Sequence, residues 1–212
     1  MSMNFSRWAS LFPYFSFGQV RMSVLSPDQA LKLLVDGNQR YVRGEAEHPN
    51  RDELRRSKTL KKQEPFAIIL GCSDSRVSPE IIFDQGIGDL FIVRVAGNVA
   101  GPVELGSLEF SALQFHSSLI LVLGHADCSA VKAVMNGETR DVEAIADFIQ
   151  PAIDKARELP GDFLVNSVKM NIQLVVSQLK NNSVLSQLVK LKKLKIIGGY
   201  YDLESGAVNF FQ

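Results

Sequence analysis

The sequence is poor in cysteine and histidine and carries no net charge. Its 212 residues include two cysteines and three histidines, and 23 basic residues balance 23 acidic ones. Two cysteines are too few for a scaffold built on disulfides. A pI near 6.8 provides no overall positive field that would attract nucleic acid or an anionic membrane. We therefore expect no nucleic-acid binding, and the 46% hydrophobic content is typical of a globular domain.

Long apolar runs are also missing, because none reaches the roughly 18 to 20 residues that a membrane-spanning helix needs. Residues 1–21 are unusual, since they gather aromatic side chains behind one arginine and contain no small-residue cleavage site. We interpret them as an N-terminal extension that is either disordered, packed on a partner, or placed before a true start at Met22. The sequence favours a cytoplasmic protein, and the alternative is export if residues 1–21 act as a leader.

Residues 22–212 are predicted to form one α/β domain. Ser26, Pro27 and Gln29 form the pattern of a helix N-terminus, and the predicted helical arm ends at Gly44. Unbroken apolar runs predict strands that are buried on both faces, as in a parallel sheet. These runs are Phe66–Leu70, Leu90–Ala96, Leu119–Leu123 and Leu194–Ile197. Helical patterns lie between them, and the chain closes with a predicted hairpin over 200–211. We therefore expect a mainly parallel central sheet flanked by helices.

Chemically active side chains follow two of the predicted strands. Gly71-Cys72-Ser73-Asp74-Ser75-Arg76 comes directly after one strand, and Gly124-His125-Ala126-Asp127-Cys128 comes directly after another. Ligand sites in open α/β sheets gather at the carboxyl ends of strands. Cys72, His125 and Cys128 can therefore converge on one point, and two sulfur ligands with one imidazole are most typical of zinc.

Simpler interpretations of the same residues remain open at this point. A buried cysteine is often only a small apolar side chain. A disulfide between Cys72 and Cys128 would leave His125 without a role, and a Cys72 nucleophile activated by His125 would leave Cys128 without one. Because the zinc hypothesis uses all three residues, we favour it. His48 and His116 are interpreted as surface histidines.

Only three protein ligands are found, so the fourth position around a metal is expected to hold water or the carboxylate of Asp74. Arg76 lies two residues further and can hold that carboxylate in a bidentate ion pair. We expect the two residues to act as a switch. The site is open when Asp74 turns to Arg76, and closed when Asp74 binds the metal.

These motifs together resemble the β-class carbonic anhydrases. The similarity runs from about Ser26 to the end of the chain. It includes Cys72–Arg76, Phe83–Gly86, Asp89–Asn98, His125–Cys128 and Tyr201–Gly206. The resemblance implies reversible hydration of carbon dioxide to bicarbonate and a proton, through a zinc-bound hydroxide. It also implies an obligate dimer or a tetramer, with the active site at the subunit interface.

The resemblance assigns roles to individual residues. Cys72, His125 and Cys128 would bind one Zn²⁺ per chain, Asp74 would join them only in the closed state, and Asp74 and Arg76 would form the catalytic dyad. The residues that would line the substrate site are Gln63, Phe91, Ala96 and Phe110.

Two positions depart from the family pattern. Ser129 follows Cys128 at a position where members of the family commonly have glycine. This departure keeps one alternative reaction open, which is the hydrolysis of carbon disulfide or carbonyl sulfide. Ile69 replaces the tryptophan of members that have a regulatory bicarbonate pocket, so we expect no such pocket. In a non-enzymatic alternative, the zinc would only stabilise the fold. The presence of both Asp74 and Arg76 argues against this alternative.

Overall fold

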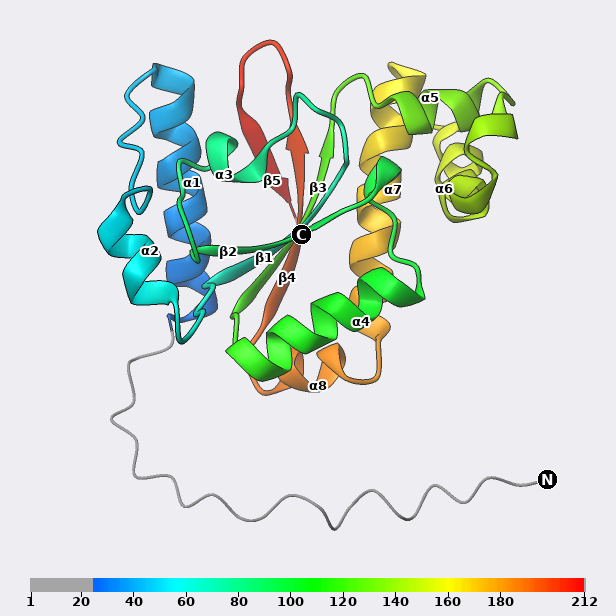
Figure 1. The fold of residues 1–212 in the computed structure, drawn as a ribbon. Helices are drawn as coiled ribbons and strands as arrows, with labels where there is room; N and C mark the ends of the chain where they lie inside the picture. Colours follow the sequence, from blue (N-terminus) through cyan, green and yellow to red (C-terminus); the bar gives the residue numbers. More distant parts are fainter. Residues whose placement is uncertain (1–24, 212) are drawn as a thin grey trace, which may run out of the picture.

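The computed structural model describes residues 25–211. The hypotheses on residues 1–21 lie outside this range. The central sheet has five strands in the order β2-β1-β3-β4-β5 (Figure 1). Their bounds are Ala67–Gly71 for β1, Leu90–Arg94 for β2, Leu119–His125 for β3, Lys195–Tyr201 for β4 and Val208–Phe211 for β5. Strands β1 to β4 are parallel, and β5 pairs with β4 in the antiparallel sense. The predicted α/β fold and the terminal hairpin are confirmed.

Eight α-helices are described, and they flank the sheet. Their bounds are Pro27–Arg43 for α1, Glu53–Thr59 for α2, Pro79–Ile82 for α3, Pro102–Phe110 for α4, Ser129–Met135 for α5, Glu143–Ala156 for α6, Phe163–Asn181 for α7 and Leu185–Lys190 for α8. A π-helical turn over Ser111–Phe115 extends α4, and short 3-10 turns cover Ala96–Asn98 and Thr139–Asp141. No helix within residues 25–211 is long and apolar enough to cross a membrane.

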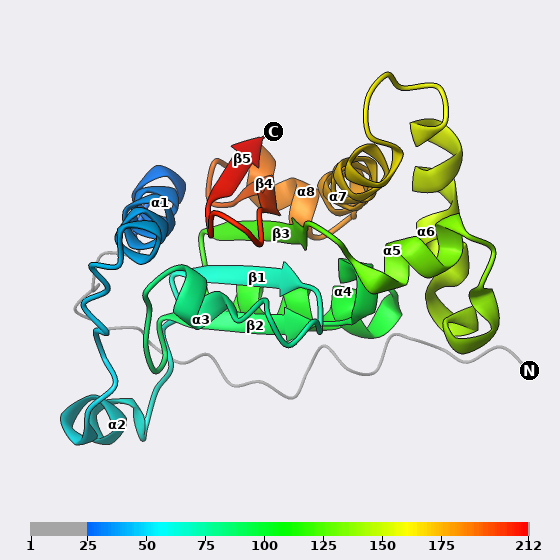
Figure 2. The ribbon, with the colours of Figure 1, turned by 90° about the horizontal axis from the view of Figure 1, so that it is seen from above.

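The side chains of β1 and β3 alternate between two separate apolar cores. Ile68, Ile120 and Val122 face the core that α4 to α8 cover, whereas Ile69 and Leu121 face the core under α1 and α3. Figure 2 shows α1 and α7 on opposite sides of the sheet. Since every residue of β1 and β3 is buried, the prediction of strands covered on both faces is confirmed for these two.

The same prediction is wrong for β2 in the single chain. Leu90 to Val93 are only half-buried, and Arg94 is exposed. The reason is position, because β2 lies at the edge of the sheet and pairs with β1 alone. An apolar run indicates a strand, but it does not say how many neighbours that strand has.

Helix α1 begins and ends as its sequence predicts. The Ser26 side chain accepts a hydrogen bond from the Gln29 backbone N–H, and the Gln29 side chain accepts one from the Ser26 N–H. The helix ends at Gly44, whose φ of 70° is in the left-handed region that glycine adopts without strain.

Buried Asn38 fixes α1 to the rest of the chain. Its amide nitrogen donates to the carbonyl oxygens of Ile82 and Gly206, and its oxygen accepts from the Val208 N–H. One side chain therefore joins the helix to α3 and to the terminal hairpin.

Replacing Asn38 by leucine should destabilise the fold strongly. The substitution Asn38→Leu leaves three backbone groups without their partner, and we expect a loss of about 3 kcal/mol in the free energy of unfolding. Denaturant unfolding followed by circular dichroism measures it. The neighbouring Gln39 is exposed, so Gln39→Ala is the control and should change stability by less than about 0.5 kcal/mol. Equal effects of the two substitutions would contradict the role of Asn38.

Candidate metal centre

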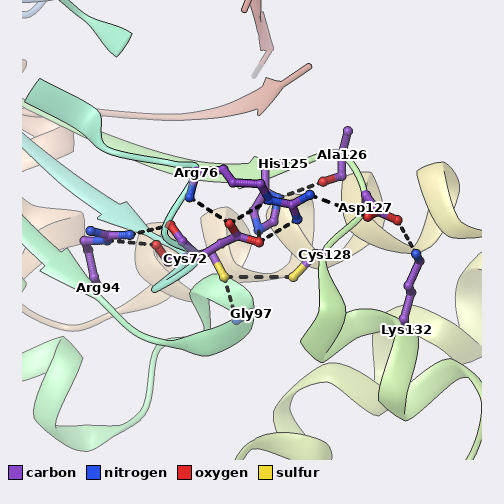
Figure 3. A network of polar contacts seen from close by, with 10 residues as sticks. Cys72, Arg76, Arg94, Gly97, His125, Ala126, Asp127, Cys128 and Lys132 are labelled. Atoms are coloured by element: carbon purple, nitrogen blue, oxygen red, sulfur yellow. Dashed lines mark hydrogen bonds and ion pairs between the residues drawn. The ribbon is translucent and has the colours of Figure 1, made fainter. Parts of the chain in front are cut away.

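The three predicted metal ligands meet at the carboxyl ends of β1 and β3. These strands are neighbours, with Gly71 paired to Leu123, so Cys72 follows β1 close to the point where His125 ends β3. The chain then turns at Asp127, whose φ of 58° is left-handed, and this turn brings Cys128 back towards Cys72 (Figure 3). The ligand atoms of all three residues lie within 4.8 Å of one another. The predicted convergence is confirmed.

Cys72 and Cys128 are buried free thiols whose sulfur atoms are 3.9 Å apart. A disulfide is therefore not the state of this site. The Cys128 thiol donates towards Cys72 and, with further help from His125, lowers the pKa of Cys72 to about 4. The same pairing raises the pKa of Cys128. Two adjacent sulfurs that share a proton are well suited to a cation, because a positive ion stabilises both as thiolates.

His125 presents one ring nitrogen to the two sulfurs. Its Nδ1 donates to the Ala126 carbonyl oxygen at 2.7 Å, and that contact leaves the lone pair of Nε2 free. Nε2 is buried and has no hydrogen-bond partner among the described residues. A buried imidazole nitrogen without a hydrogen-bond partner costs free energy. A metal ion bound to that nitrogen would remove this cost. The donor set therefore fits zinc.

The electrostatics of His125 support the same conclusion. Burial alone lowers the pKa of this imidazole, but the nearby Cys72 sulfur, with the Ala126 carbonyl and the Asp74 carboxylate, outweighs burial, and the net effect raises the pKa. The pocket therefore favours positive charge at the position that the ligand atoms surround.

Asp74 and Arg76 form a bidentate ion pair beside the ligands. Arg76 donates from Nε at 3.0 Å and from Nη2 at 2.8 Å, and its backbone N–H adds a third bond of 2.9 Å. These donors hold the pKa of Asp74 far below its usual range. Asp74 thus takes the orientation that the sequence predicts for an open site. Its Oδ2 is still only 3.8 Å from Nε2 of His125.

Three further contacts at this site were not predicted. The exposed Arg94 donates to the carbonyl oxygens of Cys72 at 3.0 Å and Asp74 at 2.6 Å, so it fixes the loop after β1 from the end of β2. The Gly97 N–H donates to the Cys72 sulfur at 3.3 Å. The position of Arg94 at the carboxyl end of a strand could have indicated a role, whereas nothing in the sequence indicated Gly97.

Asp127 joins the network from the other side. Its carboxylate lies 3.7 Å from Nη1 of Arg76 and forms an ion pair with Lys132. The Lys132 ammonium is the main reason that the pKa of Asp127 is lowered. Arg76 therefore lies between two carboxylates, and it binds Asp74 more closely.

The predicted substrate-lining residues are divided between the two ends of the sheet. Ala96 lies after β2, next to Gly97 and hence near Cys72. Phe91 and Phe110 instead contact the Phe115 ring, with centroid distances of 6.0 and 5.3 Å, close to the amino end of β2. Gln63 is exposed and precedes β1, so the length of the strand separates it from Cys72. Within one chain, only Ala96 lies near the metal ligands.

The other residues named in the sequence analysis lie either on the surface or in the core. His48 and His116 are exposed, as predicted. Ser129 is the first residue of α5 and is exposed, so its side chain does not fill the space among the ligands. Nothing in this position favours sulfur-containing substrates. Ile69 is fully buried in the core under α1 and α3.

Comparisons with known proteins agree on one family. A family model described as carbonic anhydrase matches residues 67–208. A carbonic anhydrase of Mycolicibacterium smegmatis is 37% identical over 190 residues, which cover 86% of this chain and 92% of the relative. A Coccomyxa β-carbonic anhydrase solved with acetazolamide is 25% identical, with a TM-score of 0.68 over 84% of this chain and 85% of its own. A tetrameric β-carbonic anhydrase of Sordaria macrospora shares the fold at 16% identity, with a TM-score of 0.65 over 85% of this chain and 96% of its own.

Removing any one of the three ligands should abolish tight metal binding. The purified chain should hold about one zinc ion, and Cys72→Ser, His125→Ala and Cys128→Ser should each reduce the content to about a tenth or less. Elemental analysis after dialysis against a weak chelator measures it. His116→Ala is the matched control, because this histidine is exposed, and it should retain the full content. Retention of zinc by the ligand variants would contradict the assignment.

Proposed function

This chain belongs to the β-class carbonic anhydrases, and we propose that it uses one zinc ion to hydrate carbon dioxide reversibly to bicarbonate and a proton. The observation that carries the proposal is the buried group of Cys72, His125 and Cys128, with an imidazole nitrogen that has no hydrogen-bond partner among residues 25–211. Zinc held by these residues would supply a Lewis acid that makes water nucleophilic near neutral pH.

Asp74 has the properties needed to orient the attacking water. Because the ion pair with Arg76 keeps its pKa low, the carboxylate stays ionised at neutral pH and can only accept hydrogen bonds. The O–H of a water held at the site would donate to Asp74, so that a lone pair of the water oxygen is directed at the carbon of the substrate. The Asp74 side chain is 13% exposed, which leaves it close to bulk water for proton release.

Arg76 acts through Asp74. Its two guanidinium contacts and its backbone N–H hold three of the positions around the carboxylate. For Asp74 to reach the metal in a closed state, it must exchange these charge-assisted bonds for a metal bond. We propose that the bonds from Arg76 to Asp74 favour the open state when no substrate is bound. Asp127 is the second carboxylate that faces Arg76.

We also propose that two copies pair through the β2 edge of the sheet. A twofold axis at this edge would place the amino end of β2 of one copy beside the carboxyl end of β2 of its partner. Gln63, Phe91 and Phe110, which lie towards the amino ends of β1 and β2, would then approach the metal site of the partner. Exposed apolar side chains near this edge support the pairing, with Phe110 52% exposed. The tetrameric Sordaria relatives are consistent with self-association.

A cytoplasmic location is part of the same proposal. Buried thiols that serve as metal ligands must remain reduced, and a reducing compartment keeps them so.

Stopped-flow hydration of carbon dioxide tests the reaction and the role of Asp74 together. The purified chain should turn over, and Asp74→Asn should lower kcat/KM by about 100-fold or more while the zinc content is unchanged, because a neutral amide no longer accepts the hydrogen bond as strongly. Asp154→Asn is the control, since Asp154 is an exposed residue of α6. Zinc without turnover in the unmodified chain would overturn the function. Equal turnover in Asp74→Asn would overturn the role of Asp74 alone.

Disrupting the β2 edge should separate the copies. Phe110→Glu should shift the mass measured by light scattering towards that of a 23.5 kDa monomer and should lower hydration, because the substitution places a charge in the apolar contact that we propose between the two copies. Leu191→Glu is the control, because Leu191 is 63% exposed and follows α8. A monomeric unmodified chain with full activity would contradict the proposed pairing.

A further inference from the structure

A chain of two hydrogen bonds joins helix α7 to the sulfur of Cys72. The Asn171 amide nitrogen donates to the Gly97 carbonyl oxygen at 2.8 Å, and the Gly97 N–H donates to the Cys72 sulfur at 3.3 Å. Figure 3 shows the second contact, with Gly97 below the Cys72 side chain. Gly97 therefore connects a metal ligand on one side to a helix of the surrounding layer on the other.

The loop that carries Gly97 adopts a demanding backbone conformation. Gly97 has a φ of 71° and Asn98 a φ of 44°, so two successive residues are left-handed. A Cβ atom on Gly97 would lie 2.7 Å from the end of the Ile149 side chain, so any other residue would displace that side chain and would also be strained by the positive φ. Such a conformation persists only where surrounding contacts hold it.

Asn171 supplies one of those contacts. The peptide between Gly97 and Asn98 is held at both ends, because its N–H donates to the Val95 carbonyl oxygen at 3.0 Å and its C=O accepts from Asn171. With this peptide fixed, the N–H before it points at the Cys72 sulfur. The link from α7 thus sets the direction of the hydrogen bond to the ligand.

The setting of Asn171 is unfavourable for stability alone. The residue is 1% exposed, and its Oδ1 has no hydrogen-bond partner among the described residues. Its neighbours on the same face of α7 are apolar, and they include Val168, Ile172 and Val175. A buried amide with one unpaired half is costly in such surroundings. Stability alone therefore does not explain why an asparagine stands at position 171. Its one side-chain hydrogen bond, to Gly97, points to another role.

We propose that Asn171 is a positioning residue of the metal site, which acts through Gly97 to keep a hydrogen bond on the Cys72 thiolate. A hydrogen bond to a metal-bound sulfur withdraws charge from it and fixes its orientation, and both effects tune the metal. The inference rests on the zinc site proposed above. It adds a residue of α7 that is remote in sequence and whose amide donates to Gly97 rather than to a metal ligand.

Substitution with cobalt(II) tests the inference in a spectrum that a loss of packing alone does not shift. In Asn171→Leu, the sulfur-to-cobalt charge-transfer band should move to longer wavelength, because a thiolate without its hydrogen bond donates charge more readily. Zinc affinity, measured by competition with a chelator, should fall by about 10-fold or more. If the leucine variant does not fold, Asn171→Ala removes the same donor without adding volume.

Gln178→Leu is the matched control. Gln178 lies two turns further along α7, and its amide nitrogen donates at 2.8 Å to the carbonyl oxygen of Ala100 in the same loop. Among the described residues, no hydrogen bond leads from Ala100 to Cys72. This variant should keep the band and the affinity of the unmodified chain. Unchanged values in Asn171→Leu, or equal changes in both variants, would overturn the inference. Absence of a charge-transfer band in the unmodified chain would overturn the metal site itself.

Discussion

The pairing of β1 with β3 is the constraint on which the rest of the site depends. Both strands are buried on both faces, so their side chains must alternate between two cores, and a slip of one residue would turn every side chain to the wrong core. The register that satisfies both cores also pairs Gly71 with Leu123. Cys72 and His125 are therefore brought together by apolar packing, before any attraction between the ligands themselves.

A second layer of contacts converts this proximity into a defined geometry. Arg94 holds the carbonyl groups of Cys72 and Asp74, Arg76 holds the Asp74 carboxylate, and the Ala126 carbonyl fixes the tautomer of His125. Most of these contacts are to backbone atoms or between residues only a few positions apart. The candidate ligands are thus oriented partly by the loops that carry them and partly by Arg94 at the end of β2, while the pairing of β1 with β3 brings them close together.

Sequence patterns predicted the features that depend on local chemistry or on burial. The capping box at Ser26, the apolar strands and the ligands at their carboxyl ends all follow from residue type and spacing. The edge position of β2 was not predictable in this way, since an apolar run does not reveal how strands are ordered. The bond from Gly97 to Cys72 escaped prediction because it uses a backbone N–H, which every residue except proline has. Gln63, Phe91 and Phe110 were suggested only by family resemblance, and one chain does not bring them to the ligands.

The edge strand β2 has a consequence for how a single chain behaves in solution. Leu90–Arg94 carries four apolar residues and contains neither proline nor lysine, and no strand within residues 25–211 pairs with its outer side. Natural proteins usually protect such an edge with charge, proline or a bulge, because unpaired backbone groups on a flat apolar strand attract any other strand. A single chain therefore leaves the apolar strand β2 half-buried and open along its outer edge, next to the fully buried strand β1. Rapid and correct association would protect β2 as effectively as any change in sequence.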